Sequence, residues 1–265
     1  MKFCPRRNRA IPLSRTPTGN GIVADLLSFS IEDLLKLFEK QQIEGIIHLA
    51  AEGDVLACEH STGAHRLNVG VTEMLVLAAK QRDIPIILSS TDQVFSGEAG
   101  LLYESTSPNP CNQYGQQKFE AEKVVLGYTK GLVLRLPLVL GLHNKGKGSL
   151  ESMLNEGRIH GVLNLFVDEF RRCIHAIDAA RALWEALGWR SGIYHVSGPT
   201  LMSRMEMANE ITIALKECTI QLIPIFQKEK SFGYKRPSCL DLVSSKREVL
   251  DLRIGSVVQN IQNIA

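Results

Sequence analysis

The chain has 265 residues, a formal net charge of +2 and 45% apolar residues. This length and apolar content suffice for one large hydrophobic core, or for a core with a small appended lobe. The near-neutral charge excludes a broad electrostatic surface for nucleic acid or membrane, and no apolar run approaches the roughly 20 residues that span a bilayer.

The first residues and the cysteines bear on where the chain works. The basic cluster from Lys2 to Arg9 is not followed by an apolar segment, so we do not expect it to be a secretory signal. The six cysteines are scattered and form no Cys-x-x-Cys pair, and the seven histidines show no ligand spacing. We therefore expect reduced thiols, no metal site and a cytoplasmic location.

Strand-like and helix-like segments alternate along the chain, as a doubly wound parallel sheet requires. Ser30 and Asp33 predict a capped helix over residues 31–41. We expect further helices at 64–81 and 113–130, and strands at 45–49, 84–89, 131–136 and 194–198. The predicted fold class is α/β, a Rossmann-like sheet followed by a small C-terminal lobe.

The pattern loosens after Gly141, which places a domain boundary there, between residues 1–141 and 142–265. Residues 142–148 are typical of a flexible basic loop. Its Lys145 and Lys147 are candidates for a phosphate contact, although solvated loop lysines are the more common case.

One pair of segments predicts chemistry. The apolar run 84–88 ends in Ser89, Ser90 and Thr91, and Tyr114 stands four residues before Lys118. Residues four apart lie on one face of a helix, so the phenol and the ammonium group can share a site. None of the other four tyrosines has a lysine at this spacing.

The residue types suit proton transfer. A free tyrosine has a pKa near ~10, and a neighbouring cation lowers it. The Tyr114 phenol can then give a proton to a carbonyl oxygen while the Thr91 hydroxyl donates a hydrogen bond to the same oxygen. The alternative is a core tyrosine and a solvated lysine, which is the usual meaning of a bare Tyr-x-x-x-Lys match.

The segment from Ser89 to Glu122 resembles the extended short-chain dehydrogenase/reductases. It contains Ser-Thr-Asp-x-Val-Phe-x-Gly and Pro-x-Asn-x-Tyr-Gly-x-x-Lys-x-x-x-Glu. Within these enzymes it is similar to dTDP-4-dehydrorhamnose reductase and to a non-catalytic relative, the methionine adenosyltransferase β subunit. Weaker similarities, including Arg172 to Ala180 and Arg236-Pro237, extend from about residue 10 to the C-terminus.

The resemblance implies a role for each matching residue. Thr91, Tyr114 and Lys118 would be the catalytic residues; Tyr114 and Lys118 would also belong to the cofactor site, with Lys118 holding the nicotinamide ribose. The remaining implied cofactor contacts are Asp25 and Leu26 at the adenine, Ala50 and Ala51 near the pyrophosphate, and Arg15 at the 2′-phosphate of NADP. The implied substrate contacts are Thr91, Asp92 and Arg236, with Arg236 at the diphosphate of a sugar nucleotide.

Two features depart from the family pattern. The family opens with a strand, a Gly-x-x-Gly-x-x-Gly turn and a helix, and we expect this first βα unit of roughly 30 residues to be missing. Gly19-Asn20-Gly21 also fits a Gly-x-Gly-x-x-Ala fingerprint, but the weak strand signal before it favours a loop glycine pair. Gln93 replaces the tyrosine that usually follows Thr-Asp in the family.

Three hypotheses follow. The first is an NADP-dependent reductase of a 4-keto sugar nucleotide, or a related epimerase or dehydratase, with NADP(H) favoured over NAD(H). The second is a non-catalytic dinucleotide-binding regulatory subunit. The third is a truncated product that folds poorly. We expect a sugar nucleotide as the small-molecule partner, a homodimer as one possible assembly, and neither nucleic acid nor membrane as a partner.

Overall fold

The computed structural model describes residues 9–17, 19–98, 100–141 and 148–262. The chain forms two compact units, each assembled from three stretches of sequence. The first unit comprises Met1–Ser90, Asn112–Leu134 and Leu183–Ile193, and the second comprises Thr91–Cys111, Arg135–Ala182 and Tyr194–Ala265.

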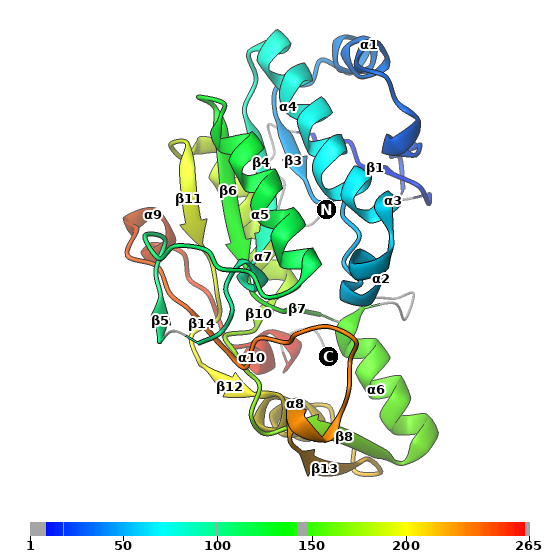
Figure 1. Cartoon of the computed structure of the whole chain (residues 1–265), viewed down its shortest axis with the longest axis vertical. Coiled ribbons are helices and arrows are strands. Elements are labelled where there is room, and N and C mark those ends of the chain that lie inside the picture. The colour runs from blue at the N-terminus through cyan, green and yellow to red at the C-terminus, as the bar shows by residue number, and fades with distance from the viewer. Residues whose placement is uncertain (1–8, 18, 99, 142–147, 263–265) are drawn as a thin grey trace. The chain divides into compact units, whose positions relative to one another are not determined.

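The first unit is built on a four-stranded sheet in the order β11-β6-β4-β3. The strands of this sheet are β3 (Ile46–His48), β4 (Ile86–Thr91), β6 (Gly131–Leu136) and β11 (Gly192–His195), of which β4, β6 and β11 belong to the first unit as far as Ser90, Leu134 and Ile193. β3 and β4 are parallel, with Ile46 opposite Ile86, and the arrows of β6 and β11 point in the same direction in Figure 1. A separate parallel pair precedes the sheet: β1 (Leu13–Ser14) and β2 (Ile22–Val23).

Three helices of the first unit contribute to the apolar core on its sheet: α1 (Ile31–Gln41), α4 (Val71–Arg82) and α5 (Gln113–Leu126). Two shorter helices, α2 (Val55–His60) and α3 (Thr62–His65), precede α4, and α2 lies against α5. Figure 1 shows α4 and α5 running alongside the strands. Leu34 of α1, Leu75 of α4 and Val125 of α5 meet Ile86 and Leu88 of β4 in one apolar cluster. The helices therefore cover the sheet with their apolar faces, as an α/β fold requires.

The predicted elements agree with the structure in kind and differ at their ends. The helix expected at 113–130 ends at Leu126, and Gly127 follows as its C-cap. The chain then turns so tightly that only glycine fits at position 131, because a Cβ there would lie 1.9 Å from the Val125 carbonyl oxygen. The strand expected at 84–89 runs instead from Ile86 to Thr91, which puts Ser90 and Thr91 inside it.

The helix expected at 64–81 is interrupted. A π-helical turn, Arg66–Gly70, joins α3 to α4. Such turns are rare and are frequent at functional sites. The sequence pattern did not predict it, because one extra residue in a turn leaves the spacing of Val71, Leu75 and Ala78 unchanged.

The Gly19-Asn20-Gly21 segment lies in the connection between β1 and β2. Gly19 has a φ of +54°, a backbone conformation that favours glycine. No helix begins at this turn; a short 3-10 helix (Leu26–Ser28) comes after β2, and α1 begins at Ile31. The segment is a loop, and its interpretation as a dinucleotide fingerprint is wrong.

The second unit contains a four-stranded sheet in the order β12-β9-β14-β5 and two parallel pairs, β13 with β8 and β10 with β7. Its strands are β5 (Leu101–Leu102), β7 (Val139–Leu140), β8 (Val162–Phe166), β9 (Phe170–Arg171), β10 (Ile174–His175), β12 (Met202–Ser203), β13 (Gln221–Ile225) and β14 (Cys239–Leu242). Its helices are α6 (Ser149–His160), most of α7 (Ala176–Glu185), α8 (Arg204–Ala214), α9 (Arg247–Leu250) and α10 (Val257–Gln262). An apolar cluster that includes Leu150, Leu154 and Ile211 forms its core.

Within the described residues, no helix combines the length and apolar character that crossing a bilayer demands.

The capping box of α1 gives a direct test of the fold. The Asp33 N–H donates to the Ser30 hydroxyl at 3.2 Å, and the Ser30 N–H donates to the Asp33 carboxylate at 3.0 Å. Ser30→Ala should lower the free energy of unfolding by about 1 kcal/mol, because a helix N–H loses its partner. Urea denaturation followed by circular dichroism measures the change. Ser61 precedes α3 without a side-chain cap bond, so Ser61→Ala should have a smaller effect.

Candidate functional site

Helix α5 carries the tyrosine and lysine of the predicted site. Asn112 caps the helix by accepting a hydrogen bond from the Gly115 N–H at 2.8 Å. Tyr114 and Lys118 follow in the first two turns, on one face, as their spacing predicts. Tyr114 is half-buried, whereas Lys118 is only 3% exposed. The solvated-lysine interpretation is therefore wrong for Lys118.

The surroundings of Lys118 change its acidity. Burial lowers the pKa of Lys118 to about 8, although the Glu122 carboxylate acts in the opposite direction. Burial, together with the charge of Lys118, lowers the pKa of His48 to about 3. His48 at the end of β3 is therefore neutral, and its Nε2 lies 3.0 Å from the Thr72 hydroxyl. An ammonium group that is easily deprotonated near neutral pH is typical of a functional site.

The parallel β1–β2 pair places two predicted cofactor residues together. Ser14 lies opposite Val23; Arg15 directly follows β1, and Asp25 follows β2 after Ala24, at the same edge. Arg15 is exposed, while the Asp25 carboxylate accepts the Leu27 N–H at 3.0 Å and starts a 3-10 helix that contains Leu26. Ligands of open α/β sheets bind at the carboxyl ends of strands, which is the edge these residues occupy.

Ala50 and Ala51 follow β3, also at its carboxyl end, and both are half-buried. Asn68 in the π-helical turn fixes the backbone just after them. The side-chain Oδ1 of Asn68 accepts a hydrogen bond from the Glu52 N–H at 2.7 Å, and the side-chain Nδ2 donates to the Glu52 backbone carbonyl at 3.1 Å. The same amide donates to Gln117 at 2.8 Å, so one buried side chain joins this loop to α5.

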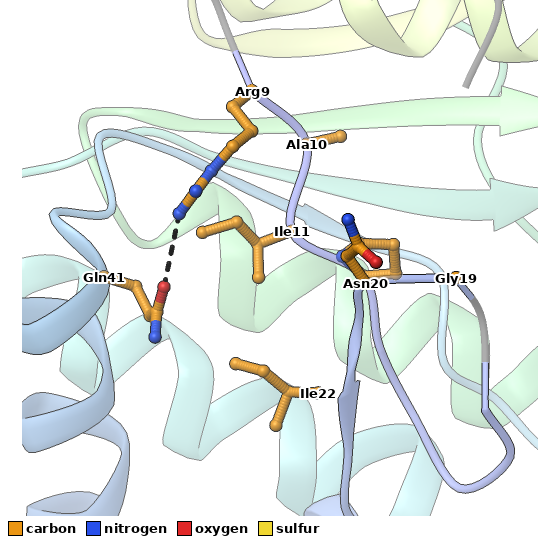
Figure 2. A pocket seen from close by; sticks show the side chains of 8 residues that line it. Arg9, Ala10, Ile11, Gly19, Asn20, Ile22 and Gln41 are labelled. Atoms are coloured by element: carbon orange, nitrogen blue, oxygen red, sulfur yellow. Dashed lines mark hydrogen bonds between the residues drawn. The ribbon is translucent and has the colours of Figure 1, made fainter.

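A cavity of about 470 Å³ in the first unit lies away from these residues (Figure 2). It is lined by residues that precede β1 and β2, by the first residue of β2 and by the last residue of α1: Arg9, Ala10, Ile11, Pro12, Gly19, Asn20, Ile22 and Gln41. Arg9 donates to the Gln41 side chain at 3.3 Å across it. The cavity opens at the amino ends of the two strands and contains none of the predicted site residues.

Thr91 and Asp92 belong to the second unit. The Thr91 hydroxyl accepts the Gln93 N–H and donates to Asp92, both at 3.2 Å. Asp92 is 3% exposed, and one of its oxygens has no hydrogen-bond partner among the described residues. Burial raises the pKa of Asp92 to about 6, although the Arg171 guanidinium 3.6 Å away favours its ionised form.

Arg236 lies in a charged cluster of the second unit that centres on Glu169. Arg236 donates to one Glu169 oxygen at 2.6 Å and 3.1 Å, and Arg204 donates to the other at 2.9 Å. Glu169 is 1% exposed, and its pKa is lowered because Arg204, Arg171 and Arg236 outweigh the effect of burial. The Arg236 guanidinium also lies 4.6 Å from the centre of the Phe232 ring.

The structure thus brings some predicted residues together and leaves others apart. It groups Tyr114 with Lys118 and Arg15 with Asp25. Whether the Thr91 hydroxyl reaches Tyr114 stays a prediction, because the two residues belong to different units. Lys145 and Lys147 lie outside the described residues. Among the described residues, no group of three or more His, Cys, Asp or Glu side chains is arranged to hold a metal ion.

Two residues at this site escaped the sequence analysis. Asn68 and Gln117 are 1% and 3% exposed, and each joins segments far apart in sequence. The one available signal was a polar residue at a helix position where apolar neighbours indicate burial. That signal does not name the partner, which depends on tertiary packing.

Comparison with known proteins identifies the family. A family model described as the RmlD substrate binding domain matches residues 20–259. The chain belongs to the RmlD substrate binding domain family. Methionine adenosyltransferase 2 subunit beta of Danio rerio is 31% identical over 220 residues, which cover 80% of this chain and 68% of that protein. The Bos taurus protein is 30% identical and is covered to 65%, so the chain spans about two thirds of these relatives.

Solved structures confirm the Rossmann-like α/β class predicted for this RmlD-family chain. A hypothetical dTDP-4-dehydrorhamnose reductase from Sulfolobus tokodaii has a TM-score of 0.80 and 26% identity, with 97% of this chain and 92% of that chain covered. The dTDP-4-dehydrorhamnose reductase of Bacillus anthracis, solved in complex with NADP, has a TM-score of 0.79 and 21% identity. Its coverage is 90% of this chain and 85% of that chain, and the likeness is one of fold.

Asp92 gives a pH-dependent test of the second unit. Its folded pKa, about 6, lies above the ~3.9 of an unfolded aspartate, so its contribution to stability is fully present below about pH 4 and is lost as the pH rises through 6. Asp92→Asn does not titrate. Between about pH 4 and pH 7, the free energy of unfolding of the variant should therefore rise relative to that of the wild type, as measured by urea denaturation.

The exposed Asp251 supplies the control, since Asp251→Asn should follow the wild type over the same pH range. If the free energies of unfolding of the wild type and of Asp92→Asn differ by the same amount at every pH, the Asp92 carboxyl is not desolvated.

Proposed function

We propose that this chain binds a nicotinamide dinucleotide and reduces a 4-keto sugar nucleotide. The observation that carries the proposal is the buried Lys118 ammonium, one helical turn after the half-buried Tyr114. Burying a lysine ammonium group lowers the stability of the folded protein. Groups with such perturbed pKa values are concentrated at functional sites. Family membership and the predicted dinucleotide edge point to the same function.

The residues present fit a dinucleotide cofactor, which would supply the hydride when bound. Lys118 would hold the hydroxyls of the nicotinamide ribose, and its positive charge would lower the pKa of the Tyr114 phenol. Tyr114 would then give its proton to the substrate carbonyl oxygen, and the Thr91 hydroxyl would donate a hydrogen bond to the same oxygen. Ala50, Ala51, Asp25 and Leu26 would contact the rest of the cofactor, as the resemblance implies.

We propose NADP(H) rather than NAD(H), because Arg15 is exposed at the edge where it would read a 2′-phosphate. A planar guanidinium matches phosphate geometry with two parallel hydrogen bonds. Solved proteins of the same fold include the Bacillus anthracis reductase with NADP and MoeE5 with NAD, so the choice depends on Arg15.

The substrate would meet residues 142–265, the proposed substrate lobe, together with Thr91 and Asp92. In the cluster around Glu169, three guanidinium groups (Arg171, Arg204 and Arg236) face two carboxylates (Glu169 and Asp92), which leaves an excess of one positive charge. This excess would attract a diphosphate, and Arg236, whose side chain is 21% exposed, would contact it.

We place this activity in the cytoplasm and propose a homodimer as one possible assembly.

A second function is a non-catalytic regulatory subunit that binds a dinucleotide. The identity of 31% to a methionine adenosyltransferase 2 subunit beta favours it. The Tyr-x-x-x-Lys pair does not exclude it, because a ribose can be held without turnover. A sugar-nucleotide epimerase or dehydratase is a further alternative within the same family.

Tyr114→Phe separates the two functions. In a reductase, the variant should lose turnover by about 10²- to 10⁴-fold, because no group replaces the proton donor. Its melting temperature and NADPH affinity should change little, since only one hydroxyl is removed. Turnover is followed by NADPH absorbance with a dTDP-4-keto-6-deoxy sugar, and affinity by fluorescence titration. Undiminished turnover would exclude the reductase mechanism, and wild-type binding without turnover would favour the regulatory subunit.

Arg15→Ala tests the cofactor preference. The variant should bind NADPH about tenfold or more weakly, because it loses charge-assisted hydrogen bonds to the 2′-phosphate, and should bind NADH nearly as before. Isothermal titration with both cofactors measures the ratio. Arg9→Ala is the matched control at the opposite end of the β1–β2 pair and should leave both affinities unchanged. Equal losses for both cofactors would show that Arg15 does not read the phosphate.

A further inference from the structure

Helix α5 carries a second buried charge one turn beyond Lys118. Glu122 is 0% exposed and lies four residues after Lys118, so Tyr114, Lys118 and Glu122 follow one another along the same face of the helix. A carboxylate that is withdrawn from water destabilises a protein unless hydrogen bonds and a counter-charge compensate. The surroundings of Glu122 supply both.

The hydrogen bond comes from β4. The Ser90 hydroxyl donates to Glu122 Oε1 at 2.5 Å, and Ser90 is itself 5% exposed. Ser90 stands next to the last residue of β4, at the carboxyl end where α/β sheets bind ligands. The bond therefore fixes the second and third turns of α5 against that end of the strand.

The counter-charge is the Lys118 ammonium. Glu122 raises the pKa of Lys118 and so opposes the effect of burial, which alone would drive the lysine further toward its neutral form. Among the described residues, Tyr114 lies one turn before Lys118 on the same face of α5, and His48 on β3 is neutral because burial, together with the charge of Lys118, lowers its pKa to about 3. Glu122 is therefore the group that keeps a positive charge at this buried position.

We propose that Glu122 is a positioning residue: its carboxylate anchors α5 to the end of β4 through Ser90 and keeps Lys118 in its ammonium form, the form that holds a dinucleotide ribose. The role of Lys118 rests on the proposed function. The effect of Glu122 on Lys118 does not, because it follows from the packing of α5, β3 and β4.

Glu122→Gln removes the charge and keeps the shape and the acceptor for Ser90. We expect the titration midpoint of Lys118 to fall by about one pH unit from its wild-type value, the usual effect of losing an opposite charge nearby. NMR of the full chain with isotope-labelled lysine measures it, with Lys118→Arg to assign the signal. At pH 8, the charged fraction then drops from about half to about a tenth, so NADPH affinity should weaken about fivefold.

Two further variants sharpen the test. Glu120→Gln removes a carboxylate from the same helix that pairs with His65 near the surface, and it should leave the Lys118 midpoint and the pH profile of NADPH binding unchanged. Glu122→Asp keeps the charge but moves it away by one methylene, so its Lys118 midpoint should fall by less than that of Glu122→Gln. If Glu122→Gln does not fold, the aspartate variant decides the question.

The outcomes are distinct. A Lys118 midpoint at the wild-type pH in every folded Glu122 variant overturns the proposal, as does an equal fall in Glu120→Gln. If the wild-type chain binds neither NADPH nor NADH, the proposed function fails, but the Lys118 titration still shows whether Glu122 sets the charge of this lysine.

Discussion

The site depends on one physical constraint, an ammonium group held out of water. Lys118 is 3% exposed, and burial alone favours its neutral form. The buried Glu122 carboxylate on the next helical turn raises the pKa of Lys118 and so opposes the effect of burial. Ser90 at the end of β4 donates a hydrogen bond to this carboxylate, and the nearby His48 on β3 is neutral. The half-buried Tyr114 lies on the same helix face, one turn before Lys118.

The second unit manages charge in a different way. Glu169 is as buried as Lys118, but three guanidinium groups surround it, and its pKa falls. Burial raises the pKa of Asp92 to about 6, because Arg171, 3.6 Å away, and Arg204 do not outweigh the desolvation of its carboxyl. The pKa values of two carboxyl groups in one cluster are thus shifted in opposite directions, down for Glu169 and up for Asp92. The contacts of Glu169 hold the Arg236 side chain in place, and the three guanidinium groups and two carboxylates leave an excess of one positive charge in this cluster.

Family membership and local chemistry support each other here, but they answer different questions. The match over residues 20–259 and the shared α/β architecture establish kinship with RmlD-type proteins. That kinship includes both reductases and a methionine adenosyltransferase 2 subunit beta, and one fold serves many functions. The local chemistry of α5 is what favours a dinucleotide site, because a buried, compensated lysine beside a tyrosine has a physical cost that a purely structural helix would avoid.

The sequence by itself determined the α/β alternation, the capped helix at Ile31–Gln41, the common face of Tyr114 and Lys118, and the loop character of Gly19-Asn20-Gly21, since each follows from spacing along one element. Only the tertiary structure decided that Lys118 is buried, that Glu122 bonds Ser90, that Asn68 reaches Gln117 through a π-helical turn, and that Glu169 gathers three arginines. Apart from Arg171, which is a sequence neighbour of Glu169, those partners lie 32 to 67 residues apart. Local periodicity carries no information about such contacts, because they are set by how the helices pack on the sheet and the strands pair.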